Sequence, residues 1–150
     1  MTRVEVCGTP LDPAALLAGL PPTGALATFV GRVRSDDGVT ELMLEHYPGA
    51  TERALRAIAD AAVARWRLDE AVIVHRVGAM APGEPIVFVA AAAAHRQAAI
   101  DGCAFMIDRL KTDAPFWKRE RRGAEIRWVE QRGDDRAAAA RWDQAPDESS

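Results

Sequence analysis

The spacing of apolar residues predicts several short strands separated by turns. Alternating or continuous apolar positions mark the strands, which we place at Val4–Cys7, Gly24–Arg34, Thr40–Tyr47, Ala71–Val77, Ile86–Ala94 and Glu125–Gln131. The strand at Ile86–Ala94 is apolar throughout, so we expect it to be buried on both faces. The sequence Ser35-Asp36-Asp37-Gly38 is typical of a turn and predicts a hairpin between the strands on either side of it.

Helical spacing and end signals predict four helices. One begins after the start signal Asp12-Pro13, and the others are expected over Thr51–Arg67, His95–Leu110 and Asp134–Trp142. Thr51 is expected to cap the second helix. Because strands and helices are mixed and a hairpin is expected, the fold class is α+β rather than a strict βαβ alternation. We expect the helices to cover one face of the sheet.

The composition is that of an ordinary globular domain. The chain has 150 residues, of which 49% are hydrophobic, and its longest apolar run is far shorter than the roughly 20 residues that span a bilayer. Its first residues lack the pattern of a signal peptide, and Cys7 and Cys103 belong to no Cys-x-x-Cys pair. We therefore expect a cytoplasmic protein without a disulfide framework. The histidines have no metal-ligand spacing, so no metal is expected.

Positive charge is concentrated in one part of an acidic chain. The formal net charge is −3, but residues 95–132 carry nine basic and six acidic side chains. Seventeen of the 19 basic residues are arginine, and the two lysines are Lys111 and Lys118. A local basic surface on an acidic protein favours a site for a small anion over a nucleic-acid groove.

Both lysines lie in the segment Leu110–Glu120, which also contains Pro115 and two aromatic residues. A lysine amine that is buried among arginines loses part of its preference for the charged form, whereas an arginine stays protonated. Such an amine can act as an acid, a base or a nucleophile. The alternative is that Lys111 and Lys118 are solvated surface cations.

Two further pairs of residues have the chemistry of an anion site. His95-Arg96 follows the buried strand and precedes a helix, where anions commonly bind. Arg32 and Arg34 are two positions apart in a predicted strand and therefore point to the same side, next to Gly31. The alternatives are a histidine that caps its helix beside a surface arginine, and an exposed strand end.

Several blocks resemble, in the same order, the large catalytic subunits of molybdopterin synthases. They are Gly24–Arg34, Leu44–Gly49, His75–Gly78, Pro82–Glu84, His95-Arg96 and Leu110–Glu120. The last block is the most specific, and the resemblance runs from Val4 to Trp142. It implies one large-subunit domain over residues 1–144, with an α/β hammerhead fold, an added α+β subdomain and helices packed on a mixed or antiparallel sheet. A disordered tail is expected over residues 145–150.

The resemblance also implies an activity and its partners. Members of this family transfer sulfur from the thiocarboxylated C-terminus of a small ubiquitin-like carrier, which ends in Gly-Gly, to cyclic pyranopterin monophosphate. The product is the dithiolene of molybdopterin, in molybdenum cofactor biosynthesis. Two large subunits form a homodimer within a heterotetramer that includes two carriers. We expect no cofactor, nucleic-acid or membrane partner.

By the same resemblance, the substrate pocket is lined by residues from several blocks. The matching positions are Arg32, Val33, Arg34, His95, Arg96, Lys111, Lys118, Arg119 and Glu120. Arg132 matches a position associated with the pocket of the same or of the neighbouring subunit. Lys111 and Lys118 are the expected catalytic residues.

Our hypothesis gives Lys111 the role of general acid/base, or of a brief acyl acceptor, while Lys118 assists as the cyclic phosphate opens. Glu120 is expected to orient Lys118 or Arg119. The phosphate is held by His95, Arg96, Arg34 and Arg132. Two alternatives remain open: a non-catalytic anion-binding scaffold that docks a ubiquitin-like protein, and a phosphatase or phosphodiesterase acting on a cyclic phosphate.

Overall fold

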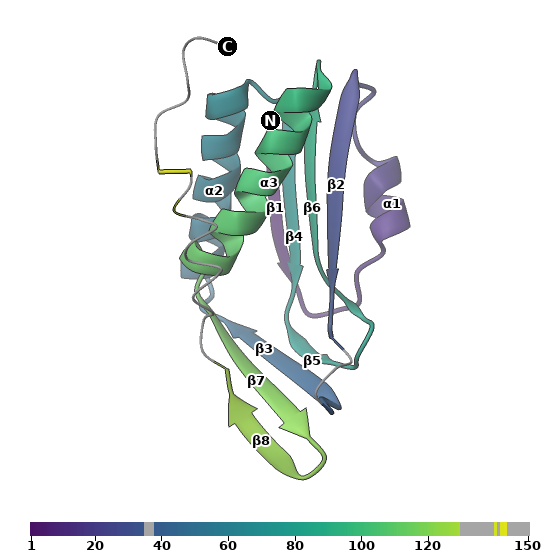
Figure 1. The fold of residues 1–150 in the computed structure, drawn as a ribbon, viewed down its shortest axis with the longest axis vertical. Coiled ribbons are helices and arrows are strands. Elements are labelled where there is room, and N and C mark those ends of the chain that lie inside the picture. The colour runs from purple at the N-terminus through teal and green to yellow at the C-terminus, as the bar shows by residue number, and fades with distance from the viewer. Residues whose placement is uncertain (35–37, 130–139, 141, 144–150) are drawn as a thin grey trace.

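The structure is a computed structural model that describes residues 1–34, 38–129, 140 and 142–143. Its elements, shown in Figure 1, follow the order β1 (Thr2–Cys7), α1 (Pro13–Ala18), β2 (Ala25–Arg32), β3 (Glu41–His46), α2 (Ala50–Trp66), β4 (Glu70–Arg76), β5 (Gly78–Met80), β6 (Pro85–Ala93), α3 (Arg96–Asp113), β7 (Phe116–Arg122) and β8 (Glu125–Trp128). The expected α+β class is confirmed. No helix among the described residues has the length and apolarity needed to cross a membrane.

Part of what the sequence predicts cannot be compared with the structure. Arg132 and the expected tail over residues 145–150 lie outside the described residues. The same is true of most of the predicted final helix, Asp134–Trp142. These three expectations stay predictions.

The large sheet has the strand order β1-β4-β6-β2. β1 runs parallel to β4, whereas the β4–β6 and β6–β2 pairs are antiparallel. On one face, Leu55 of α2 and Met106 of α3 pack in the same cluster as Val89. On the other face, Leu16 of α1 packs in a second cluster with Phe88. The expectation that the helices share one face is therefore wrong, because β6 is apolar on both faces and α1 covers the second.

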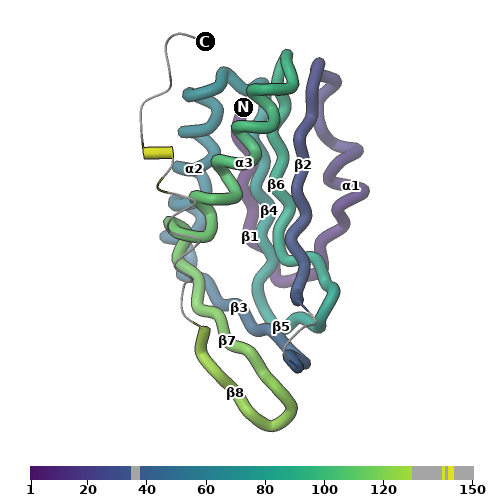
Figure 2. Tube along the Cα trace, viewed as in Figure 1, coloured from purple at the N-terminus to yellow at the C-terminus, as the bar shows by residue number. Residues whose placement is uncertain are grey.

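The small sheet has the order β5-β3-β7-β8 and lies at one end of the large sheet, as the chain trace in Figure 2 shows. Its strands are antiparallel, and it has a small core of its own, formed by Val33, Leu42, Leu44 and Met80. The predicted hairpin between β2 and β3 is wrong, since β2 pairs with β6 while β3 pairs with β5 and β7. The turn residues favour a reversal of the chain. Which strand each one pairs with depends instead on the core in which it buries its side chains.

Two strands of the small sheet, β5 and β7, are not predicted by the sequence pattern. β7 contains only two apolar residues, Phe116 and Trp117, followed by five charged ones. Periodicity therefore gives no sign of a half-buried strand there. Pairing with β3, from His46 opposite Phe116 to Glu41 opposite Arg121, makes this segment a strand.

The first and third helices begin where the sequence predicts. Asp12 is the N-cap of α1, and its carboxylate accepts a hydrogen bond from the Ala15 amide at 3.1 Å. α3 follows directly on His95 and runs to Asp113, three residues past the predicted end. It ends there because Ala114 takes the extended conformation that a residue before proline prefers.

The start of α2 differs from the predicted one. The helix begins at Ala50 with Gly49 as its N-cap, and the Glu52 carboxylate accepts a hydrogen bond from the Gly49 amide. Gly49 has a φ of 85°, which glycine adopts without strain. The prediction that Thr51 caps this helix is therefore wrong. The Thr51 side chain is fully buried and is hydrogen-bonded elsewhere.

Candidate active site

Arg32 and Arg34 flank a buried residue at the end of β2. The Val33 side chain lies in the core of the small sheet, and both neighbouring arginines are exposed. The Val33 amide donates to the Glu84 carbonyl at 2.9 Å, and the Gly83 amide donates to the Val33 carbonyl at 2.8 Å. Burial of Val33 thus turns the two arginines away from the core, which is the arrangement that the sequence predicts for an anion fork.

An ion pair between a buried arginine and a partly buried glutamate holds the turn to which Val33 is hydrogen-bonded. The guanidinium of Arg76 donates to Glu84 Oε1 at 2.5 Å and to the Ala79 carbonyl at 3.2 Å. The Ala81 amide also donates to Glu84, and these two interactions lower the pKa of the Glu84 carboxyl. Arg76 and Glu84 were not among the predicted site residues, although both lie in blocks that carry the family resemblance.

Lys111 and Lys118 stand on either side of one helix–strand corner. Lys111 is in the last turn of α3, and Lys118 is the third residue of β7, where it pairs opposite Leu44. Leu44 and Phe116 pack in the core that also contains Val33, so the corner and the arginine fork flank the same small core. Both lysines are exposed in the single chain, so the chain alone does not provide the burial that a lysine needs to lose its preference for the charged form.

The first residue of the strand that carries Lys118 packs against a buried histidine. The ring of His75 stacks on that of Phe116, with 4.1 Å between the centroids and 26° between the planes. His75 Nδ1 lies 2.9 Å from the Arg76 carbonyl oxygen, to which it donates. Burial lowers the pKa of His75 to about 4. His75 is therefore a neutral packing group at pH 7 rather than an acid or a base.

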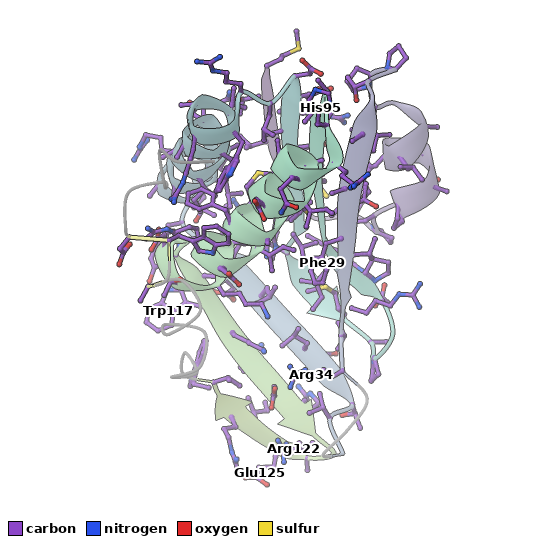
Figure 3. The ribbon with its side chains drawn as sticks, turned by 45° about the horizontal axis from the view of Figure 1, so that its top comes forward. Phe29, Arg34, His95, Trp117, Arg122 and Glu125 are labelled. Atoms are coloured by element: carbon purple, nitrogen blue, oxygen red, sulfur yellow. The ribbon has the colours of Figure 1, made fainter. Side chains whose placement is uncertain are left out.

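His95 and Arg96 lie at the opposite end of the molecule from this corner. Figure 3 shows His95 at one end and Arg34 beside the small sheet at the other. Lys111 lies fifteen positions after Arg96 in α3, a rise of about 22 Å along the helix. Both His95 and Arg96 are exposed, and the His95 side chain makes no capping hydrogen bond. One chain therefore does not bring the two halves of the predicted site together.

Arg119 and Glu120 point to opposite sides of β7. The Arg119 guanidinium lies over the Trp128 ring, 5.7 Å from its centroid. Glu120 Oε2 lies 3.4 Å from Arg122 Nη2. Glu120 thus contacts Arg122, and its expected role in orienting Lys118 or Arg119 stays a prediction.

The outer face of the small sheet carries exposed aromatic rings. Trp117 lies between Tyr47 and Trp128, at centroid distances of 6.0 and 5.7 Å. About half of each tryptophan surface is exposed, at 51% for Trp117 and 56% for Trp128. Exposed aromatic and arginine side chains of this kind are typical of surfaces that bind another protein.

Comparison with known families decides what the chain is related to. Residues 6–113 match the family model described as "MoaE protein". The chain belongs to the MoaE family. Two relatives from this family are named molybdopterin synthase catalytic subunit. The one from Ralstonia nicotianae is 49% identical over 91% of this chain and 80% of its own length. The one from Pseudomonas aeruginosa is 56% identical over 81% of this chain and 83% of its own.

Solved structures of MoaE proteins have the same fold. A molybdopterin biosynthesis MoaE protein from Burkholderia ambifaria aligns with a TM-score of 0.83 and 47% identity, over 96% of this chain and 99% of its own. A molybdopterin synthase from Staphylococcus aureus aligns with a TM-score of 0.78 and 27% identity, over 84% and 96%. A complex of subunits 1 and 2 of a molybdopterin-converting factor from Helicobacter pylori, at 21% identity and a TM-score of 0.72 over 86% of this chain and 91% of that one, shows the fold alone.

Membership of the MoaE family confirms the resemblance and the class of function expected from it, a sulfurtransferase of molybdenum cofactor biosynthesis. The roles of individual MoaE site residues stay predictions. Of the described ones, Arg32, Arg34 and Lys118 are neighbours of residues in the small core, along the chain or across the sheet, and Lys111 lies at the end of α3 that leads into β7. His95 and Arg96 lie at the other end of α3. Within the described part of the chain, no three His, Cys, Asp or Glu side chains are grouped to hold a metal ion.

Proposed function

We propose that this chain transfers two sulfur atoms from the thiocarboxylated C-terminus of a small ubiquitin-like carrier, which ends in Gly-Gly, to cyclic pyranopterin monophosphate. The two transfers build the dithiolene of molybdopterin. The observation that carries the proposal is the placement of Lys111 and Lys118 on one corner, which shares its small core with the Arg32–Arg34 fork. Family membership and the names of the relatives support it.

The charges at this end of the molecule suit both reactants, because a thiocarboxylate and a cyclic phosphate are anions. In the proposed reaction, Arg32 and Arg34 bind the phosphate with paired N–H donors. The bound carrier tail and substrate cover Lys111 and Lys118, which the single chain leaves exposed. Removal of water favours the neutral amine and makes proton transfer near neutral pH possible.

Each transfer makes two bonds and breaks two. First the thiocarboxylate sulfur bonds to a carbon of the pterin substrate while a carbon–oxygen bond of that carbon breaks, and the oxygen leaves with the phosphate as the ring opens or, in the other transfer, as water; the result is a thioester between carrier and substrate. Attack on the thioester carbonyl then breaks its carbon–sulfur bond and leaves the sulfur on the substrate. If water attacks, Lys111 acts as general acid/base and the carrier leaves as a carboxylate; if the Lys111 amine attacks, an acyl-lysine forms first. Lys118 supplies a proton as the cyclic phosphate opens.

A second copy of the chain completes the phosphate site in our proposal. His95 and Arg96 are about 22 Å along α3 from Lys111, too far to share a ligand of this size within one chain. Two copies related by a two-fold axis, with their long directions opposed, bring the His95-Arg96 end of each next to the lysine corner of the other. With one carrier per site, this gives the expected homodimer within a heterotetramer, and Arg132 is assigned to the same shared site.

The outer face of the small sheet is the surface that we assign to this second copy. Glu45 pairs opposite Trp117 on that face, Met43 opposite Arg119 and Glu41 opposite Arg121. The face thus combines an acidic row, a basic row and exposed aromatic rings, so two copies can place acid against base around an apolar centre. The carrier is the other candidate occupant, and the Trp117 variant described in the Discussion separates the two.

Reconstitution tests the proposed activity. The protein is mixed with a thiocarboxylated carrier and cyclic pyranopterin monophosphate, and dithiolene formation is followed for the wild type and for Lys111→Arg. We expect product from the wild type and a loss of at least about 100-fold in the variant, since arginine keeps its proton. Equal activity of the two would remove Lys111 from the chemistry. Carrier binding without product from the wild type would favour the anion-binding scaffold.

Mixed dimers test the shared site. Lys111→Ala and Arg96→Ala chains are each expected to be inactive, and a mixture allowed to exchange subunits is expected to recover about a quarter of wild-type activity. The matched control is a mixture of Lys111→Ala and Lys118→Ala chains, which damages the same half of every site and recovers none. No recovery in the first mixture would contradict a site shared between copies.

We also propose that residues 1–144 form one domain and that the reaction takes place in the cytoplasm. Cys7 and Cys103 are both free thiols, which suits a reducing compartment. Burial raises the pKa of the Cys103 thiol to about 11, so this cysteine is an unreactive core residue. The proposed chemistry accordingly takes its sulfur from the carrier and not from a cysteine of this chain.

A further inference from the structure

The corner between Lys111 and Lys118 is held in place by a hydroxyl group from a distant part of the sequence. Only Ala114 and Pro115 separate the last residue of α3 from the first residue of β7. The Thr51 hydroxyl, near the start of α2, donates a hydrogen bond to the Pro115 carbonyl at 2.8 Å. The same oxygen accepts a hydrogen bond from the Tyr47 amide at 2.9 Å. The Thr51 side chain is fully buried, so no water competes for these two bonds.

These two bonds continue the ladder between β3 and β7. Along that ladder, His46 pairs opposite Phe116, and the register places Tyr47 opposite Pro115 at the next position. The Tyr47 amide and the Pro115 carbonyl are the groups that could bond directly across the strands there. Instead, the Thr51 hydroxyl lies between them as a bridge. The bridge keeps the strands joined by hydrogen bonds while leaving room for the chain to turn from α3 into β7.

The Thr51 hydroxyl does not cap helix α2. Threonine is a common helix cap. Here the Glu52 carboxylate accepts a hydrogen bond from the amide of the N-cap residue Gly49 instead. The backbone amide of Thr51 donates separately to the Tyr47 carbonyl at 2.9 Å. The position of the corner is therefore what depends on this hydroxyl.

We propose that Thr51 is a positioning residue for sulfur transfer, which sets the placement of Lys111 relative to Lys118 through the Pro115 carbonyl. The inference rests on the proposed roles of the two lysines. Thr51 does not touch the substrate or the carrier. Its loss displaces the amines of the corner and leaves the Arg32–Arg34 fork, which is held by Glu84 and Gly83, in place.

Two variants and a control test this inference in the reconstituted reaction with carrier. Thr51→Val keeps the shape of the side chain but removes the bridge, and we expect its kcat to fall about 10- to 100-fold, as for other small misplacements of catalytic groups. We expect its KM for cyclic pyranopterin monophosphate to change by less than about two-fold. Thr51→Ser keeps the hydroxyl and is expected to restore kcat to within about three-fold of wild type.

Ile58→Val is the matched control for stability, because it removes one methylene from a buried residue about two turns beyond Thr51 in the same helix and leaves the Thr51 hydroxyl in place. We expect it to lower the Tm without lowering kcat. Should Thr51→Val fail to fold, Thr51→Ala takes its place, with the same expected fall in kcat. A folded Thr51→Val protein with wild-type kcat would overturn the inference, as would an equal loss of kcat in Ile58→Val or no rescue by serine.

Lys111→Ala, measured in parallel, separates failure of this inference from failure of the proposed function. An active Lys111→Ala protein would refute the role of the lysine itself. An inactive Lys111→Ala protein beside a fully active Thr51→Val protein would refute only the role of Thr51. An inactive wild type that still binds the carrier would refute the proposed activity, and the Thr51 inference with it.

Discussion

His75 and Phe116 stack on each other across the two sheets, with ring centroids 4.1 Å apart. His75 belongs to β4 of the large sheet, and Phe116 is the first residue of β7 in the small sheet, two residues before Lys118. The imidazole is buried, and its pKa is lowered to about 4 by loss of solvent. The contact that joins the two sheets next to the lysine corner therefore requires an uncharged histidine.

Stability is expected to fall in acid through His75. The unfolded histidine binds a proton near pH 6.5, whereas the folded one does so only near pH 4. Between these values the unfolded state holds more protons, so the free energy of unfolding decreases as the pH falls from 6.5 to 4, by about 3 kcal/mol in all. Urea unfolding of wild type and His75→Phe at pH 7.5, 6 and 5 measures the free energy of unfolding at each pH. In the variant this free energy should fall less between pH 7.5 and pH 5 than in the wild type. Parallel pH profiles for the two proteins would show that His75 does not titrate as described.

Removal of the Glu84 carboxylate is expected to lower the free energy of unfolding. Arg76 is buried and pairs with Glu84, so Glu84→Ala leaves a buried guanidinium without its counter-ion. Because Glu84 is itself partly exposed, we expect a loss of about 2 kcal/mol. The matched control is Glu5→Ala, which breaks the exposed Arg3–Glu5 pair and should cost less than about 0.5 kcal/mol. Equal losses in the two variants would contradict the role of burial.

Gly24→Ala is expected to be destabilising for steric reasons. A Cβ atom at Gly24 would lie 2.2 Å from the carbonyl oxygen of Ala94, a backbone atom that cannot move aside without shifting β6. We expect a loss of about 2 to 3 kcal/mol in the free energy of unfolding. At Gly8 a Cβ would meet no atom within 4 Å, so Gly8→Ala is the control and should be close to neutral. A neutral Gly24→Ala would show that the ends of β2 and β6 are not closely packed.

Arg34→Ala is expected to impair binding of the phosphate more than the chemical step. Its guanidinium is exposed at the end of β2 and does not belong to the lysine corner. Steady-state kinetics should show KM for cyclic pyranopterin monophosphate raised about ten-fold or more, with kcat changed by less than about three-fold. Arg3→Ala, on the first strand, is the control with an unchanged KM. An unchanged KM in Arg34→Ala would remove this residue from the site.

Trp117→Ala is expected to weaken association between two copies of the chain. Large exposed aromatic side chains commonly supply much of the binding energy of an interface, and we expect the dissociation constant of the dimer to rise about ten-fold or more. Sedimentation equilibrium measures it directly. Leu17→Ala, which removes an exposed apolar side chain from α1, is the control. An unchanged dimer with weakened carrier binding would assign this face to the carrier.

Short-range patterns in the sequence account for much of the fold. The continuous apolar run of β6 predicted a strand buried on both faces, and Asp12 with its following proline predicted the start of α1. β7 gave no comparable sign, because its charged residues become a strand only by pairing with β3. The pairing of β2 with β6 instead of β3 could not be predicted either, because turn residues do not indicate which distant strand will pair with β2.

For the candidate site, the sequence identifies the residues and the tertiary structure decides where they lie. The scarcity of lysine singled out Lys111 and Lys118, and the repeat of two in a strand singled out Arg32 and Arg34; these conclusions needed only the chemistry and spacing of the residues. Their place between a buried strand and a helix singled out His95 and Arg96 as well, but the length of α3 puts them at the other end of that helix from Lys111.

The chemistry of this protein follows from its sequence, and the positions of the reacting groups follow from its tertiary structure. Lysine, arginine and histidine have the same proton affinities and donor groups wherever they lie along the chain. Whether Thr51 caps a helix or bridges Tyr47 and Pro115 depends on contacts between segments more than 60 residues apart. Such contacts form only when separate elements pack around a shared core, which no local pattern of residues records.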